Sequence, residues 1–167
     1  MTNTSALRTP TRQDQVKAFD FLMGAWNVQH RRLTERLIGS DNWQVFSGQM
    51  NARPLLDGIG NMDDNQLDLP GDPYRAISLR TYDPANDKWA IWWLDGRRPH
   101  SLDVPVLGQF HEGIGVFFAE DVLEGKPIKV RFKWTGTDTD TPRWEQAFSP
   151  DDGITWEVNW TMDFSRK

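Results

Sequence analysis

Apolar and polar residues alternate one by one along most of the chain after residue 25. From Ile128 to Trp134 every second residue is apolar and the residues between are Lys or Arg, and residues 154–164 alternate in the same way. Successive side chains of a β-strand point to opposite faces, so this pattern predicts strands with one buried and one solvated face. We therefore expect a chain built mainly of β-strands.

Turn-forming residues separate these strands from one another. Clusters of Asp, Asn, Pro and Gly at residues 83–87, 124–126 and 151–153 are typical of hairpin loops, because these residues favour turn geometry. The pattern predicts further strands at residues 25–33, 43–53, 55–63, 74–82, 88–95, 101–107 and 110–121. About ten neighbouring antiparallel strands with short links are enough to close a sheet on itself. We predict an all-β fold, a single antiparallel up-and-down (meander) β-barrel of about ten strands with a short N-terminal helix.

The N-terminal region predicts that helix. Apolar residues recur at helical spacing within Gln13–Met23, Thr11 can cap the first turn, and Gly24 can end the helix. A chain of 167 residues has the length of one domain. We therefore expect a flexible lead at residues 1–10 and a single barrel domain at residues 11–167.

The composition excludes several classes of chemistry. The chain has no Cys, which excludes disulfides, thiolate catalysis and Cys-based metal sites. Its net charge of −5 argues against a nucleic-acid partner, since such proteins usually carry a basic surface. The polar N-terminus lacks the apolar core of a signal peptide, and no apolar run approaches the ~20 residues of a transmembrane helix. We expect a cytoplasmic protein without a membrane partner.

The three His residues do not predict a metal site. No two of His30, His100 and His111 lie at i, i+2 spacing on one strand, although ligands can also come from separate strands. We therefore expect no metal and no cofactor.

The segment FDFLMGAW, residues 19–26, resembles the opening of the calycin barrels, the lipocalins and fatty-acid-binding proteins. This resemblance implies structural roles for Gly24, for Trp26 at the closed end of the barrel, and for Arg166 lying over that indole. FDFLMGAWNVQHRRL, RPLLDGIGNMDDN, WAIWWLDGRRPH and RWEQAFSPDDGITWEVNW together resemble an uncharacterised bacterial family of calycin-like proteins across residues 19–166. That family implies a fold, but it brings no agreed activity and no catalytic residues.

Residues 149–156, SPDDGITW, fit the Asp-box pattern S-x-D-x-G-x-T-W of sialidases and other propeller proteins. Those proteins repeat the box on successive blades, whereas it occurs once here, in a chain too short for such a propeller. We interpret it as a structural hairpin rather than a glycosidase site. Gly153 would supply a positive φ, Asp151 and Ser149 would bond turn amides, and Trp156 would pack beneath.

The first strand contains two candidate ligand-binding residues. If Trp26 points into the barrel, so do His30 and Arg32. Buried polar groups need partners, because each unpaired group costs several kcal/mol. One interpretation is that a carboxylate such as Glu112 or Asp95 satisfies them. The other is that they line a cavity and hold an anionic or carbonyl-bearing ligand.

The nine Trp and nine Phe residues predict flat apolar walls, which either fill a barrel or enclose one small ligand. Trp92 and Trp93 cannot both point inward on a regular strand. Trp92 is a candidate ligand residue, and the indole that faces outward suggests a homodimer surface.

Two polar segments complete the candidate site. The loop from Asp95 to His100 forms either a mouth of the barrel or a solvated turn. Arg53 and the polar residues within 61–65 either bind a ligand head or fasten a long hairpin. The candidate ligand-binding residues are His30, Arg32, Arg53, Trp92, Asp95 and His100.

Three functions are compatible with this sequence. The first is binding of a small, partly apolar molecule. The second is a cofactor-independent isomerase, cyclase or lyase, for which His30, His100 and Glu112 are the candidate acids or bases. The third is a structural or dimerising protein with a filled barrel. An interior cavity of roughly 300 Å³ or more would distinguish the first from the third.

Overall fold

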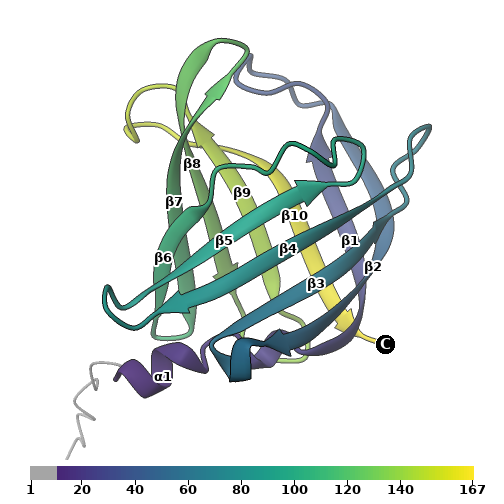
Figure 1. The fold of residues 1–167 in the computed structure, drawn as a ribbon. Helices are drawn as coiled ribbons and strands as arrows, with labels where there is room; N and C mark the ends of the chain where they lie inside the picture. The colour runs from purple at the N-terminus through teal and green to yellow at the C-terminus, as the bar shows by residue number, and fades with distance from the viewer. Residues whose placement is uncertain (1–10) are drawn as a thin grey trace, which may run out of the picture.

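The computed structural model describes residues 11–167, so the predicted flexible lead at 1–10 lies outside the described residues. It confirms the predicted fold class: ten antiparallel strands form a closed meander barrel in which each strand pairs with its neighbours in sequence and β1 pairs with β10 (Figure 1). The strands are β1 (Gly24–Leu33), β2 (Trp43–Leu55), β3 (Gly60–Leu67), β4 (Tyr74–Asp83), β5 (Lys88–Asp95), β6 (Val106–His111), β7 (Ile114–Leu123), β8 (Lys126–Thr135), β9 (Arg143–Ser149) and β10 (Glu157–Arg166).

The predicted helix over Gln13–Met23 is wrong in its extent. Thr11 caps it in a reciprocal capping box, but α1 covers only Arg12–Val16, and a 3-10 helix, η1, follows at Asp20–Leu22. The side chain of Gln15 donates to the carbonyl of Phe110 and accepts from its amide, and the Gln15 carbonyl accepts from the Trp89 indole at 2.8 Å. These contacts hold α1 against β5 and β6.

Several predicted strand boundaries are also wrong. The strand expected at 55–63 begins only at Gly60, because residues 56–58 form a 3-10 turn, η2 (Leu56–Gly58). The strands expected at 101–107 and 110–121 are β6 and β7, which a turn at residues 112–113 separates. The strand expected at 154–164 begins only at Glu157, and a bulge between Val158 and Trp160 interrupts its alternation.

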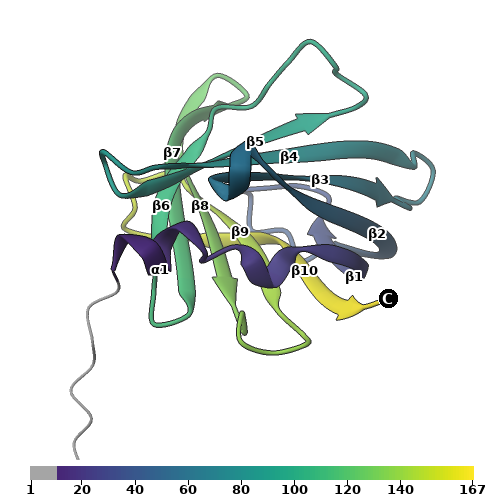
Figure 2. The ribbon, with the colours of Figure 1, turned by 60° about the horizontal axis from the view of Figure 1, so that its bottom comes forward.

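One end of the barrel is closed by aromatic packing. In Figure 2, α1 and η1 cross beneath this end. The buried Trp26 indole donates to the carbonyl of Leu22 at 2.8 Å, and the Arg166 guanidinium lies 3.7 Å from the Trp26 ring centre. Arg166 also donates to the carbonyls of Phe21 and Met23, and Gly24 takes a φ of 104° where the chain enters β1. The structure thus brings Gly24, Trp26 and Arg166 together at the closed end.

The opposite end carries five loops, which join β1 to β2, β3 to β4, β5 to β6, β7 to β8, and β9 to β10 (Figure 1). We call this the open end. None of the helices within residues 11–167 has the length and apolar character needed to cross a membrane.

Candidate functional site

Arg32 points toward the open end from the inner face of β1. The pairing of β1 with β10 places it opposite Trp160, and its guanidinium lies 4.7 Å from the Trp160 ring centre. It also donates to the hydroxyl of Tyr74 at 3.2 Å. Among residues 11–167, no carboxylate forms an ion pair with Arg32, so this half-buried cation has only an aromatic face and a phenol as partners.

Arg36, in the loop between β1 and β2, provides a second cation at this end. Its guanidinium lies over the ring of Phe148, 5.5 Å from the centre. Glu157 is the acidic group that acts on it electrostatically, but its carboxylate accepts a hydrogen bond from the amide of Leu37 and forms no ion pair with Arg36. Burial, followed by the charge of Arg32, lowers the pKa of Arg36 to about 10. The two guanidiniums therefore repel each other across the open end.

Arg97 is the third arginine here, and its charge is compensated. It forms ion pairs with Asp95 at 2.7 Å and Asp72 at 2.5 Å, and it lies 3.6 Å from the centre of the Tyr74 ring. Burial alone raises the pKa of Asp95, but the hydrogen bonds and charge of Arg97 outweigh burial and lower that pKa below its ordinary value. Asp95 thus pairs with Arg97, and the suggestion that it satisfies His30 or Arg32 is wrong.

His30 lies one layer deeper than Arg32 and is 1% exposed. Its Nδ1 accepts a hydrogen bond from the Trp160 indole at 3.2 Å, and its ring stacks on Phe46 with the centres 4.7 Å apart. Burial, followed by the charge of Arg32, lowers the pKa of His30 to about 4. The imidazole is therefore neutral at pH 7 and holds the indole of Trp160 in place.

The remaining predicted residues lie away from this cluster. Arg53 is exposed on the outer face of β2, where it contacts the sulfur of Met62 at 3.3 Å. Trp92 faces outward on β5, because its neighbour Trp93 packs inside against Trp160. His100 is exposed in the loop between β5 and β6.

The candidate acids and bases are not assembled into one site. Glu112 lies in the turn between β6 and β7, at the closed end, so it does not partner His30 or Arg32 as one interpretation suggested. His30 is inside the barrel and His100 is in an open-end loop. Among the described residues 11–167, no three His, Cys, Asp or Glu side chains are grouped so that they could hold a metal ion.

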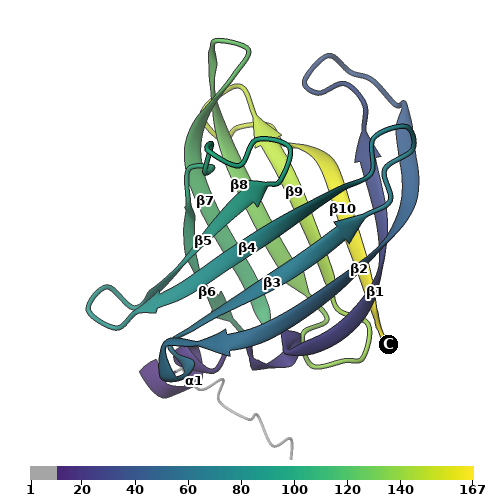
Figure 3. The ribbon, with the colours of Figure 1, turned by 45° about the vertical axis from the view of Figure 1, so that its right-hand side comes forward.

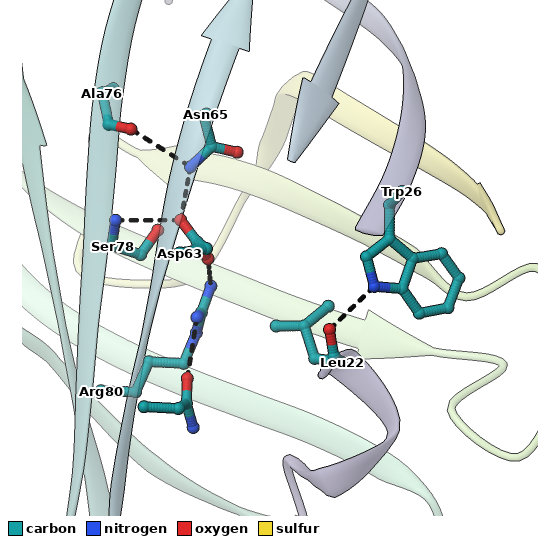
Figure 4. A network of polar contacts seen from close by, with 8 residues as sticks. Leu22, Trp26, Asp63, Asn65, Ala76, Ser78 and Arg80 are labelled. Carbon is teal, nitrogen blue, oxygen red and sulfur yellow. Dashed lines mark hydrogen bonds and ion pairs between the residues drawn. The ribbon is translucent and has the colours of Figure 1, made fainter. Parts of the chain in front are cut away.

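A buried polar network crosses the inner faces of β3 and β4 (Figure 4). Arg80 and Asp63 form an ion pair at 2.5 Å, with side chains 4% and 1% exposed. Asp63 also accepts from the amide of Ser78 and the side chain of Asn65, and Arg80 donates to Asn61 at 3.0 Å. Arg80 Nε has no hydrogen-bond partner among the described residues. Sequence reasoning missed the role of Arg80; the signal was that residues 61, 63 and 65 and residues 78 and 80 are all polar at alternate positions.

The polar network faces an aromatic wall across a small cavity. Trp93, Phe132, Trp134 and Trp144 lie on the far side, together with aliphatic and Met side chains. The cavity has a volume of about 30 Å³, which is room for one or two water molecules. This is far below the roughly 300 Å³ expected for an enclosed ligand. The middle of the barrel is filled by side chains.

The Asp-box segment forms a closed network of its own between β9 and β10. Asp151 accepts hydrogen bonds from the hydroxyl of Ser149 and from the amide and hydroxyl of Thr155. Gly153 has a φ of 90°, and its carbonyl accepts from the Trp156 indole at 3.0 Å. The polar atoms of the motif are thus used within the loop.

No family model matches the chain, and no curated protein matches it. Among solved structures, the S-type phycobiliprotein lyase of Guillardia theta is similar, with a TM-score of 0.56 and 9% sequence identity over 93% of this chain and 94% of that chain. This likeness shows a shared barrel fold. Membership of the uncharacterised bacterial family stays a prediction.

Proposed function

We propose that the open end of the barrel binds a small, partly apolar molecule that carries an anionic group. The observation that carries this proposal is the pair Arg32 and Arg36, two half-buried guanidiniums that repel each other and form no ion pair with a carboxylate among residues 11–167. A carboxylate or sulfonate placed between them would accept forked hydrogen bonds and relieve the repulsion.

The rings around these cations would hold the apolar part of the molecule. Trp160, Phe148 and Tyr74 lie against Arg32 or Arg36, so a flat hydrocarbon body would contact aromatic faces while its acid group met the guanidiniums. The small interior cavity favours the open end over the centre of the barrel as the binding site. His30 is a positioning residue in this arrangement, because it holds the Trp160 indole rather than the acid group.

Isothermal titration calorimetry with 1-naphthoate and its neutral amide, 1-naphthamide, tests the proposal. We expect 1-naphthoate to bind and 1-naphthamide to bind much more weakly. Arg32→Gln and Arg36→Gln should each weaken 1-naphthoate binding about tenfold or more, since each removes charged hydrogen bonds to the acid. Arg31→Gln is the matched control, because Arg31 lies on the same strand, exposed, over Trp43.

The control separates a site from a general effect of charge. If Arg31→Gln weakened binding as much as Arg32→Gln, or if the acid and the amide bound equally, the proposed anion site would be wrong.

A further inference from the structure

Strand β7 is longer than the strand beside it. Pairing between β6 and β7 runs from His111 opposite Ile114 to Leu107 opposite Phe118. β7 continues to Leu123, but its last five residues pair only with β8. Figure 3 shows the β7–β8 hairpin extending past β6 toward the open end.

Pro105 explains why β6 does not continue alongside β7. Extending the register by two residues places Pro105 opposite Glu120, and proline has no amide hydrogen to donate to the neighbouring strand. The chain instead turns toward β5, where the amide of Asp103 donates to the carbonyl of Trp93 at 3.0 Å. A gap therefore separates β7 from the loop between β5 and β6.

Most of the backbone groups that face this gap are unpaired. His111 and Ile114 flank a two-residue turn, so Ile114 and every second residue after it on β7 direct their amides and carbonyls toward β6. By this alternation the backbone amides and carbonyls of Glu120 and Val122 face the gap. Within residues 11–167, neither has a backbone partner on that side, and the amide of Val122 donates to the Asp121 side chain at 2.7 Å. The gap exposes a sheet edge.

An apolar groove of about 650 Å³ runs along this edge. Val104, Leu107, Phe118 and Trp156 contribute apolar side chains to its lining, and Glu120, Lys129 and Asp152 contribute charged ones. Val104 is 51% exposed and Phe118 is 47% exposed, which is a large apolar area to leave in water. A groove of this volume has room for several side chains of an extended peptide.

The exposed edge is acidic, and Lys129, which lies opposite Glu120 on β8, is already paired with Asp152 at 2.6 Å. Glu120 and Asp121 belong to the edge, and Asp103 stands across the gap. Burial raises the pKa of Asp103, the charge of Arg98 lowers it, and the charge of Asp121 raises it to a smaller extent. Like charges on an edge oppose its pairing with the same edge of a second copy. They favour a strand that carries basic side chains.

We propose that the Glu120–Val122 edge binds an extended, basic segment of a partner protein as an added β-strand. The unpaired amide and carbonyls would form main-chain hydrogen bonds, the groove would take alternate apolar side chains, and the carboxylates would attract the basic ones. This site lies on the outer wall and is separate from the arginine pair proposed for the small anion.

The test uses a labelled hexapeptide, Ac-Lys-Val-Lys-Val-Lys-Val-NH2, and fluorescence anisotropy with the native protein. We expect this peptide to bind, the Glu-for-Lys peptide not to bind, and the Lys peptide with N-methylated valines to bind about tenfold more weakly or worse, because methylation removes main-chain donors and keeps the charge. Glu120→Pro should weaken binding far more than Glu120→Gln, which keeps the amide.

Two results would overturn the proposal. Equal binding of the methylated and unmethylated Lys peptides would show charge attraction without strand addition. Self-association of the native protein that Glu120→Pro abolishes, measured by analytical ultracentrifugation, would show that the edge pairs with a second copy. The methylated peptide is tested on the native protein, so the outcome does not depend on whether Glu120→Pro folds.

Discussion

The buried imidazole of His30 predicts that the protein loses stability in mild acid. The pKa of His30 falls from 6.5 to about 4 on folding. Between pH 4 and pH 6.5 the imidazole is therefore protonated in the unfolded chain and neutral in the folded protein. Stability therefore rises with pH through this window. One histidine with these two pKa values lowers the free energy of unfolding by about 2 kcal/mol at pH 5 relative to pH 8, and by about 3 kcal/mol near pH 4.

Urea denaturation followed by tryptophan fluorescence, at intervals between pH 5 and pH 8, measures this loss. His30→Gln removes the titrating group while its side-chain oxygen can still accept from the Trp160 indole, so its free energy of unfolding should change much less over the same range. His100→Gln is the matched control, because His100 is exposed in the loop between β5 and β6, and it should keep the native pH dependence. If native protein and His30→Gln lost stability in parallel, the neutral, buried imidazole would be refuted.

Three further changes test other parts of the structure. Arg80→Met leaves the Asp63 carboxylate buried without its cation and should lower the free energy of unfolding, measured by urea denaturation, by about 3 to 5 kcal/mol. Adding Asp63→Leu should recover part of that loss, and a double variant as unstable as the single one would contradict this. Gly48→Ala places a Cβ 2.5 Å from the Gln66 carbonyl oxygen and should cost about 1 to 3 kcal/mol, seen as a lower Tm. Asp151→Ala removes three hydrogen bonds and should lower the free energy of unfolding by about 1 to 3 kcal/mol, with faster amide hydrogen exchange at residues 153–155. Unchanged exchange there would show that the loop does not need the carboxylate.

The barrel was predictable because its outer face is polar and its inner face is mostly apolar. The alternation at Ile128–Trp134 matches β8, whose side chains follow the predicted faces. The structure also places Gly24, with its positive φ, at the start of β1 and buries Trp26 two residues later. These features are local, so a sequence pattern can express them.

The errors arise where contacts distant in sequence decide the local structure. The strand at residues 55–63 was misplaced because β3 turns Asn61, Asp63 and Asn65 inward, where the pattern expects apolar residues. Their partner Arg80 comes from β4. Only the pairing of the two strands gives these buried polar side chains the hydrogen bonds that offset the cost of burying them. Arg36 was missed because the sequence places it in a loop, and its approach to Phe148 depends on how the open end is assembled.

Net charge and local charge lead to different conclusions about partners. The overall −5 argues against a polyanion, because a nucleic acid responds to the field of a whole surface. A small anion responds to the potential at one point. At the open end Arg32 and Arg36 have no carboxylate partner among residues 11–167, because the nearby carboxylates of Asp72 and Asp95 pair with Arg97. The acidic residues Glu120 and Asp121 lie elsewhere, at the exposed edge of β7. The same acidic chain therefore presents one site suited to a small anion and another suited to a basic strand.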